Sequence, residues 1–199
     1  MIETVVYSKK YRVAGRLDRV GYLQDDLSVV DIKSGSSIAF TTCLQTAAYQ
    51  NLFNEHAGSC EFDEQTHVYK DKDGVVPSVT TVINDNSFVD KTCIPQQFII
   101  AAGNFGKAVH LACEYDDKHV LDYSKLDNKI SPYVRAWMRF KIDCHYEDYK
   151  PNKLKDKIKR RFAVLLKPDG TYKLEEYKNK ADWQVFLACL TLYNFRRRS

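Results

Sequence analysis

Hydrophobic and polar positions alternate in short stretches through much of the chain and recur at helical spacing in others. β-Formers on both sides of a polar break at residues 24–26 predict a hairpin over residues 11–33. Apolar positions three or four apart predict helices. The pattern as a whole predicts a strand at 2–8, hairpins at 11–33, 62–76 and 162–174, and helices at 42–54, 78–84, 95–118, 131–146 and 181–194. Strands mixed with helices in this order favour an α/β (α+β) sandwich around a mixed sheet.

The first predicted hairpin brings acidic residues face to face. A two-residue turn at residues 24–25 sets Asp18 opposite Asp31 and Arg16 opposite Lys33. Opposed residues lie roughly 5 Å apart at Cβ, where like charges are destabilising. A divalent metal ion between the carboxylates would reverse that effect. Lys33 shares the face of Asp31 because side chains alternate along a strand. Two carboxylates and one ammonium on the same sheet face are typical of the active site of a metal-dependent phosphodiesterase. The simpler alternative is that these charged residues lie on an ordinary strand face exposed to solvent.

Polar residues on the following predicted helix extend this pattern. Gln45 and Tyr49 are four residues apart on one face, and an ordinary amphipathic helix would also explain them. In order, the chain reads Gly15-x-x-Asp18, Asp31-x-Lys33 and Gln45-x-x-x-Tyr49. This series resembles the RecB-type branch of the PD-(D/E)xK nucleases, and the phage and prophage exonucleases within it. The resemblance implies a restriction-endonuclease-like mixed sheet flanked by helices.

The same resemblance implies a role for each matching residue. Asp18 and Asp31 would bind Mg²⁺ or Mn²⁺, and Lys33 would orient or activate the attacking water. The resemblance adds the carbonyl of Ile32 and the upstream acid Glu3 as further metal ligands, and Gln45 and Tyr49 as accessory catalytic residues beside the site and the DNA. Metal ions held by carboxylates can both neutralise the transition state and supply a nucleophile at neutral pH.

Two segments in the middle of the chain also resemble this branch. Residues 67–81 look like its His-x-Tyr…Pro-Ser-Val-Thr segment, in which Ser78 is a candidate N-cap, and Ser78 and Thr80 are candidate DNA contacts. The helix carrying Gly106-x-x-x-His110 is similar to one whose histidine is often a metal ligand. A histidine satisfied within the core is the alternative.

The order of these segments departs from the family pattern. In relatives, the segment resembling residues 59–148 precedes the one resembling residues 1–58, and here it follows. Residues 149–199 resemble the usual ending. We therefore expect a single nuclease domain over residues 1–199 with rearranged connectivity, in which the helix of His110 packs beside the 11–33 hairpin or the segment is exchanged between protomers of a homo-oligomer.

Composition sets further limits. A length of 199 residues suits one domain, and no apolar run approaches the roughly 20 residues that span a bilayer. Six scattered cysteines form no Cys-x-x-Cys pair, so we expect reduced thiols, a cytoplasmic protein and no iron–sulfur cluster. The net charge of +4 is weak evidence for nucleic acid. A basic run including Lys155, Lys157, Lys159 and Arg160 is either a phosphate-contacting patch or a solvated loop.

Three functions compete at this stage. The first is a metal-dependent DNA exonuclease of phage recombination or repair, acting with a recombinase or single-strand annealing partner. The second is a catalytically inactive DNA-end-binding or recombination-partner module on the same fold, which the presence of Asp18, Asp31 and Lys33 disfavours. The third is a metal hydrolase acting on another substrate.

Overall fold

The computed structural model describes residues 2–55, 60–86, 88, 94–150 and 156–197. Within these ranges the strands are β1 (Ile2–Ser8), β2 (Val13–Leu23), β3 (Asp26–Lys33), β4 (Glu61–Asp63), β5 (Val68–Asp71), β6 (Gly74–Val76), β7 (Glu147–Asp148), β8 (Arg160–Leu166) and β9 (Tyr172–Glu176). The helices are α1 (Thr42–Glu55), α2 (Val79–Asp85), α3 (Gln96–Asp117), α4 (Ser131–Asp143) and α5 (Ala181–Arg196), with a short 3₁₀ turn at Tyr123–Lys125. The main helices, strands and hairpins therefore fall close to where the sequence predicts them.

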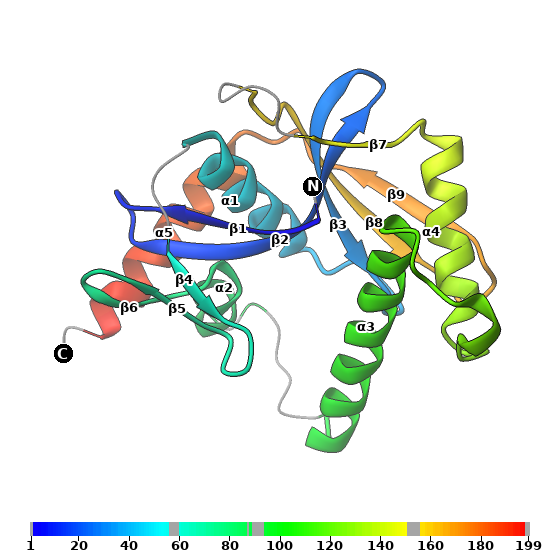
Figure 1. The fold of residues 1–199 in the computed structure, drawn as a ribbon. Helices are drawn as coiled ribbons and strands as arrows, with labels where there is room; N and C mark the ends of the chain where they lie inside the picture. The colour runs from blue at the N-terminus through cyan, green and yellow to red at the C-terminus, as the bar shows by residue number, and fades with distance from the viewer. Residues whose placement is uncertain (1, 56–59, 87, 89–93, 151–155, 198–199) are drawn as a thin grey trace.

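A mixed sheet forms the centre of the molecule (Figure 1). Its strands lie in the order β1-β2-β3-β8-β9, and β7 pairs with β2 outside that path. β3 and β8 are parallel, whereas the other pairs are antiparallel. The expected α/β architecture around a mixed sheet is confirmed at this level.

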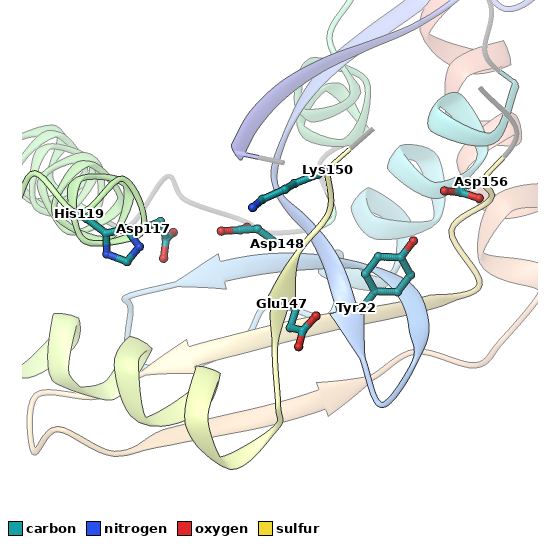
Figure 2. A pocket seen from close by; sticks show the side chains of 7 residues that line it. All are labelled: Tyr22, Asp117, His119, Glu147, Asp148, Lys150 and Asp156. Atoms are coloured by element: carbon teal, nitrogen blue, oxygen red, sulfur yellow. The ribbon is translucent and has the colours of Figure 1, made fainter. Parts of the chain in front are cut away.

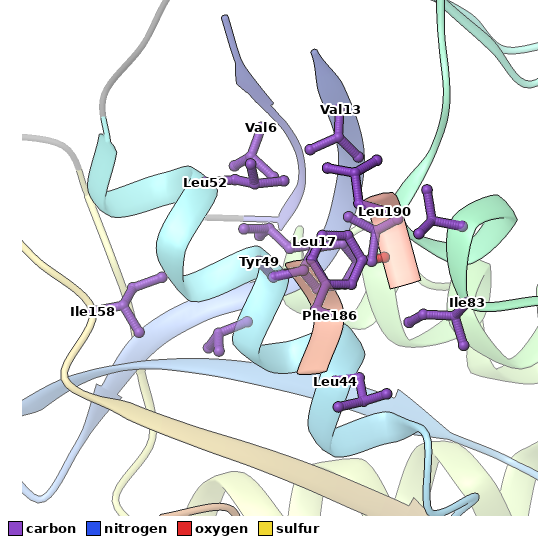
Figure 3. Packing of buried hydrophobic residues seen from close by; sticks show 14 of the residues in the cluster. Val6, Val13, Leu17, Leu44, Tyr49, Leu52, Ile83, Ile158, Phe186 and Leu190 are labelled. Atoms are coloured by element: carbon purple, nitrogen blue, oxygen red, sulfur yellow. The ribbon is translucent and has the colours of Figure 1, made fainter. Parts of the chain in front are cut away.

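The helices form two layers, each with its own hydrophobic cluster. The first cluster joins α1, α2 and α5 to the sheet through residues such as Leu44, Leu52 and Phe186 (Figure 3). The second joins α3 and α4 to the sheet around Trp137 and Phe140, which are fully buried. Burying a large apolar side chain contributes about 1.5–3 kcal/mol, so these stripes fix both helix layers against the sheet.

The β2–β3 turn fixes the register of the first hairpin. Gln24 and Asp25 have φ values of 50° and 69°, as in the type I′ turn that matches the twist of antiparallel strands. Leu23 pairs with Asp26 as predicted, and the pairing continues to Arg19 opposite Val30.

A second, three-stranded sheet corrects the prediction for residues 62–76. The stretch expected as one arm of a hairpin divides into β4 and β5, because the chain turns at residues 64–67, where His67 has φ 54°. β5 and β6 form a hairpin that turns at residues 72–73, with Asp71 opposite Gly74. Ser78 caps α2 by accepting a hydrogen bond from the N–H of Thr81 at 2.9 Å. The cap prediction is confirmed.

Glycine allows two close approaches to β2. A Cβ on Gly15 would lie 2.6 Å from the Tyr49 ring, and one on Gly21 would lie 2.5 Å from the Glu147 carbonyl oxygen. Gly15 thus lets α1 bring Tyr49 against the sheet, and Gly21 lets β7 pair with β2.

Among the residues that the structure describes, no helix is long and apolar enough to cross a membrane.

Candidate metal and nuclease site

The pairing of β2 with β3 ends just before Asp18. β1 and β3 lie on opposite edges of β2: β1 pairs as far as Ile2 opposite Arg19, and β3 pairs from Arg19 to the turn. The carboxylate of Asp18 then replaces the backbone partner, because its Oδ2 accepts a hydrogen bond from the N–H of Ile32 at 2.7 Å. This bond ties Asp18 to the strand that carries Asp31.

Glu3, Asp18 and His110 converge beside this point. One ligand atom from each lies within 4.8 Å of the others, on β1, β2 and α3 respectively. Glu3 has φ 48°, a backbone conformation uncommon for a residue other than glycine. Burial, followed by the charge of Asp18, raises the pKa of the Glu3 carboxyl. Two carboxylates and an imidazole at this spacing could hold a divalent cation.

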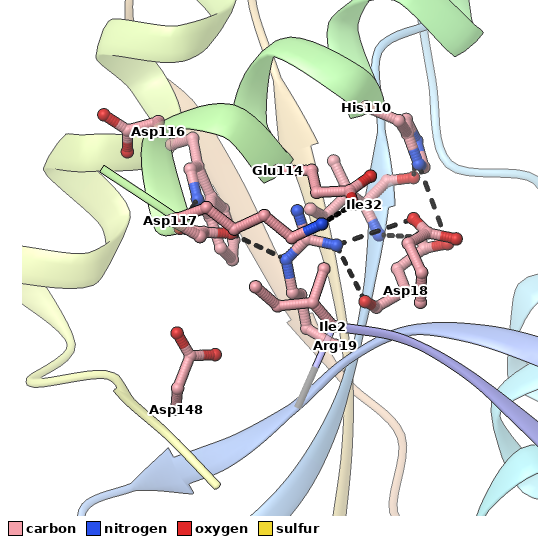
Figure 4. Close-up of polar contacts among 12 residues, drawn as sticks. Ile2, Asp18, Arg19, Ile32, His110, Glu114, Asp116, Asp117 and Asp148 are labelled. Carbon is pink, nitrogen blue, oxygen red and sulfur yellow. Dashed lines mark hydrogen bonds and ion pairs between the residues drawn. The ribbon is translucent and has the colours of Figure 1, made fainter. Parts of the chain in front are cut away.

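His110 is held in one tautomer by a backbone contact. Its Nε2 lies 3.0 Å from the carbonyl oxygen of Ile32, and its Nδ1 lies 3.6 Å from Oδ1 of Asp18 (Figure 4). A carbonyl oxygen only accepts, so Nε2 carries the proton. In the neutral ring, Nδ1 therefore presents its lone pair toward Asp18, as a metal ligand requires. The same contact occupies the Ile32 carbonyl, which the sequence resemblance suggests as a ligand.

A chain of polar contacts connects Asp31 to Tyr49, which lines a cleft with the triad. Lys33 Nζ lies 2.7 Å from Oδ2 of Asp31 and donates to Oε1 of Gln45 at 3.3 Å. Gln45 in turn donates to the hydroxyl of Tyr49 at 3.0 Å. Burial opposes the charge on Lys33, but Asp31 and Asp18 outweigh it and raise the pKa of the ammonium. Lys33 is therefore a stable cation, suited to stabilising negative charge rather than to removing a proton.

The surroundings of Asp31 disfavour the charged form of its carboxylate. Its side chain is 1% exposed, and among the described residues its Oδ1 has no hydrogen-bond partner. Burial raises its pKa to about 6; Lys33 opposes that rise and the charge of Asp18 adds to it. A bound cation would offset both the burial cost and the repulsion. The donor set therefore fits a hard divalent metal, with Glu3, Asp18 and His110 as the residues that would hold it and Asp31 adjacent.

Glu3, Asp18 and His110 border a cleft of about 810 Å³, and Tyr49 also lines it. β4, β5 and the start of α2 line one part of it, and α3 lines another. Ser78 and Thr80, the candidate DNA contacts, are among the lining residues. Ser78 is also used as the α2 cap, and its hydroxyl lies 3.0 Å from that of Thr80.

The predicted basic run lies elsewhere. Lys159 pairs with Asp26 at 3.0 Å and Arg160 with Glu176 at 2.8 Å, and neither they nor Lys157 line the cleft. Lys155 lies outside the described residues. In β8, Arg160 pairs opposite Ser28, three positions before the level of Asp31, which is about 10 Å along the strand.

Sequence reasoning missed a buried charge network behind the site. Arg19 is fully buried, and its Nε donates to Asp117 at 2.8 Å while its Nη1 donates to the backbone carbonyl of Asp18 at 2.8 Å (Figure 4). Asp117 also accepts from Trp137 and from Lys141. Arg19 directly follows Asp18 and lies three residues after Arg16 in the same strand, so no local sequence pattern indicated that it is buried.

Asp117 also borders a second hollow of about 780 Å³ (Figure 2). Half of its other lining residues are acids, Glu147, Asp148 and Asp156, and the rest are Tyr22, His119 and Lys150. In the described ranges, no three potential ligand atoms converge there, so the cluster of Glu3, Asp18 and His110 remains the candidate metal centre.

Comparisons with protein-family models, with curated proteins and with solved structures found no match for this chain.

Proposed function

We propose that this protein is a metal-dependent deoxyribonuclease, with a restriction-endonuclease-like core built on β2, β3, α1 and β8. The observation that carries the proposal is the convergence of Glu3, Asp18 and His110 within 4.8 Å, next to a buried carboxylate already paired with a lysine. The motif resemblance supports DNA as the substrate and exonuclease action as the mode.

In this proposal, the chain's own groups divide the work. Glu3, Asp18 and His110 would hold the cation, which when bound supplies charge neutralisation and an acidified water. The Lys33 ammonium, fixed by Asp31 and Gln45, stabilises negative charge that develops on the phosphate. Gln45 and Tyr49 position Lys33 through their hydrogen bonds.

The test is cleavage of linear duplex and single-stranded DNA with Mn²⁺, Mg²⁺ or EDTA. We expect hydrolysis with either metal, none with EDTA, and none with Asp18→Asn, whose amide cannot supply a carboxylate ligand. Asp143→Asn, an exposed acid outside the cleft, is the matched control and should cleave normally. Metal-independent cleavage, or full activity of Asp18→Asn, would contradict the proposal.

A further inference from the structure

Apolar side chains lie exposed beside the candidate metal centre. Leu111 and Tyr115 are one helical turn apart on α3, and both line the cleft with His110. They are 46% and 42% exposed, respectively. Phe62 and Tyr69 line the cleft from the small sheet, with their ring centroids 4.6 Å apart. Tyr69 is buried and the Arg16 guanidinium lies 5.1 Å from the centre of the Phe62 ring, so the exposed apolar surface beside the candidate metal centre is that of Leu111 and Tyr115 on α3.

Charges around the cleft are mostly paired. Arg16 pairs with Glu3 at 3.0 Å, and Lys118 pairs with Glu114. Lys107, one turn before Leu111, is exposed and has no acidic partner among the described residues. A duplex carries one negative charge per roughly 1.7 Å of its axis and is held chiefly by neutralising cations. One unpaired lysine on these walls is a poor match for that surface.

A single strand binds by different means. Its unpaired bases stack on aromatic side chains, and this stacking tolerates any sequence because every base has a π-face. A cleft of about 810 Å³ is in the range that encloses one small ligand, and so suits a nucleotide or two of one strand.

We propose that the cleft receives a single nucleic-acid strand, in which a base next to the phosphate at the metal centre stacks on Tyr115 and Leu111 while Lys107 contacts the backbone. This inference rests on the proposed function for the position of the phosphate. It adds that the cleft prefers an unpaired strand to a duplex, and it makes Tyr115 a residue that determines this specificity.

A protein partner or a second copy of this chain could also cover apolar residues. The strand is favoured because Leu111 and Tyr115 line the same cleft as His110, so the apolar surface adjoins the candidate metal centre. An occupant there would also meet Lys107, which is complementary to a phosphate.

Binding in EDTA tests this without any cleavage. Fluorescence anisotropy with a labelled ten-nucleotide single strand and its duplex, at low salt, should show tighter binding of the single strand. Tyr115→Ser should weaken single-strand binding about 5- to 100-fold, the loss of one stacked base. Tyr115→Phe keeps the ring and should bind like the unchanged protein.

Phe195→Ser is the matched control, since Phe195 is 73% exposed and outside the cleft, and it should leave binding unchanged. Equal or tighter binding of the duplex would overturn the inference, as would normal binding by Tyr115→Ser. A change of sedimentation rather than binding in Tyr115→Ser would assign the surface to a second copy instead. Because no cleavage is measured, failure here is separate from failure of the nuclease proposal.

Discussion

At the scale of single residues, Asp18 joins two parts of the site. Its Oδ2 is fixed by the N–H of Ile32, so its Oδ1 is directed toward His110. A carboxylate oriented by a backbone donor loses little freedom when it binds a ligand, which favours tight metal binding. Lys33 and Asp31 each depend on the other for charge balance, and two predictions follow from that pair.

Lys33→Ala should lower the rate of DNA cleavage by about 10²–10³, the usual loss for removing a group that stabilises transition-state charge. Metal and DNA binding should change little, because the proposed ligands remain. Single-turnover cleavage with Mn²⁺, together with anisotropy, measures the two effects separately. Lys125→Ala, an exposed lysine outside the cleft, is the control. Near-normal turnover by Lys33→Ala would remove Lys33 from the mechanism.

Asp31 should make the protein without metal less stable as the pH rises. Its pKa is raised from 3.8 to about 6 in the folded protein by burial. The folded state therefore retains a proton that the unfolded state has lost, so this stabilisation is complete below pH 3.8 and is lost as the pH passes through 6. Asp31→Asn removes the titration.

In EDTA, the melting temperature of Asp31→Asn minus that of the unchanged protein should be more positive at pH 8 than at pH 5. A change of about 3–6 °C corresponds to the shifted pKa for a chain of this length. Comparing the two proteins at each pH cancels the other titrating groups. A difference that stays constant between pH 5 and pH 8 would show that Asp31 is not held in a costly charged state.

At the scale of elements, the sequence predicted features that depend on neighbouring residues better than features that depend on long-range contacts. The polar break at residues 24–26 fixed the β2–β3 register, and Ser78 was found as a cap, because both depend on neighbours in sequence. β7 was missed, since two residues carry no periodic signal and their pairing depends on Gly21. The burial of Arg19 was missed because Asp117 is 98 residues away in the chain.

Gly15→Ala should separate α1 from β2. The added Cβ would lie 2.6 Å from the Tyr49 ring and 3.2 Å from Val79, and overpacking of this kind costs about 1–3 kcal/mol. Urea unfolding measures the loss. Gly103→Ala is the control of opposite sign, because its Cβ would meet nothing within 4 Å, and alanine in a helix gains about 0.5–1 kcal/mol over glycine. Equal stability of the two variants would refute the packing argument.

Asp117→Ala should be among the most damaging changes outside the site. It leaves the fully buried Arg19 without its closest carboxylate, and removal of one partner of a buried pair costs about 3–5 kcal/mol. Glu64→Ala, at a side chain that is 82% exposed, should change the free energy of unfolding by less than about 0.5 kcal/mol. Chemical unfolding of both variants measures the contrast, and a loss under 1 kcal/mol for Asp117→Ala would mean that Arg19 is solvated.

At the scale of the whole molecule, the order of segments raises the question of whether one chain completes the site. Three separate segments supply Glu3, Asp18 and His110, and the structure brings them together within a single chain. Two contacts link α3 to the sheet at this point, from His110 to Ile32 and from Asp117 to Arg19. The predicted packing of the His110 helix beside the first hairpin is thus observed, although the sequence alone left exchange between protomers open.

Mixing two inactive variants distinguishes these arrangements. Asp18→Asn and His110→Ala each remove one ligand, and both should be inactive in DNA cleavage. If segments were exchanged between protomers, a mixed dimer would contain one site with both ligands intact and activity would return. Because the site is complete within one chain, every site in the mixture remains defective and we expect no recovery after co-refolding at any ratio. Recovery toward a quarter of normal activity at an equal ratio would show that protomers share the site.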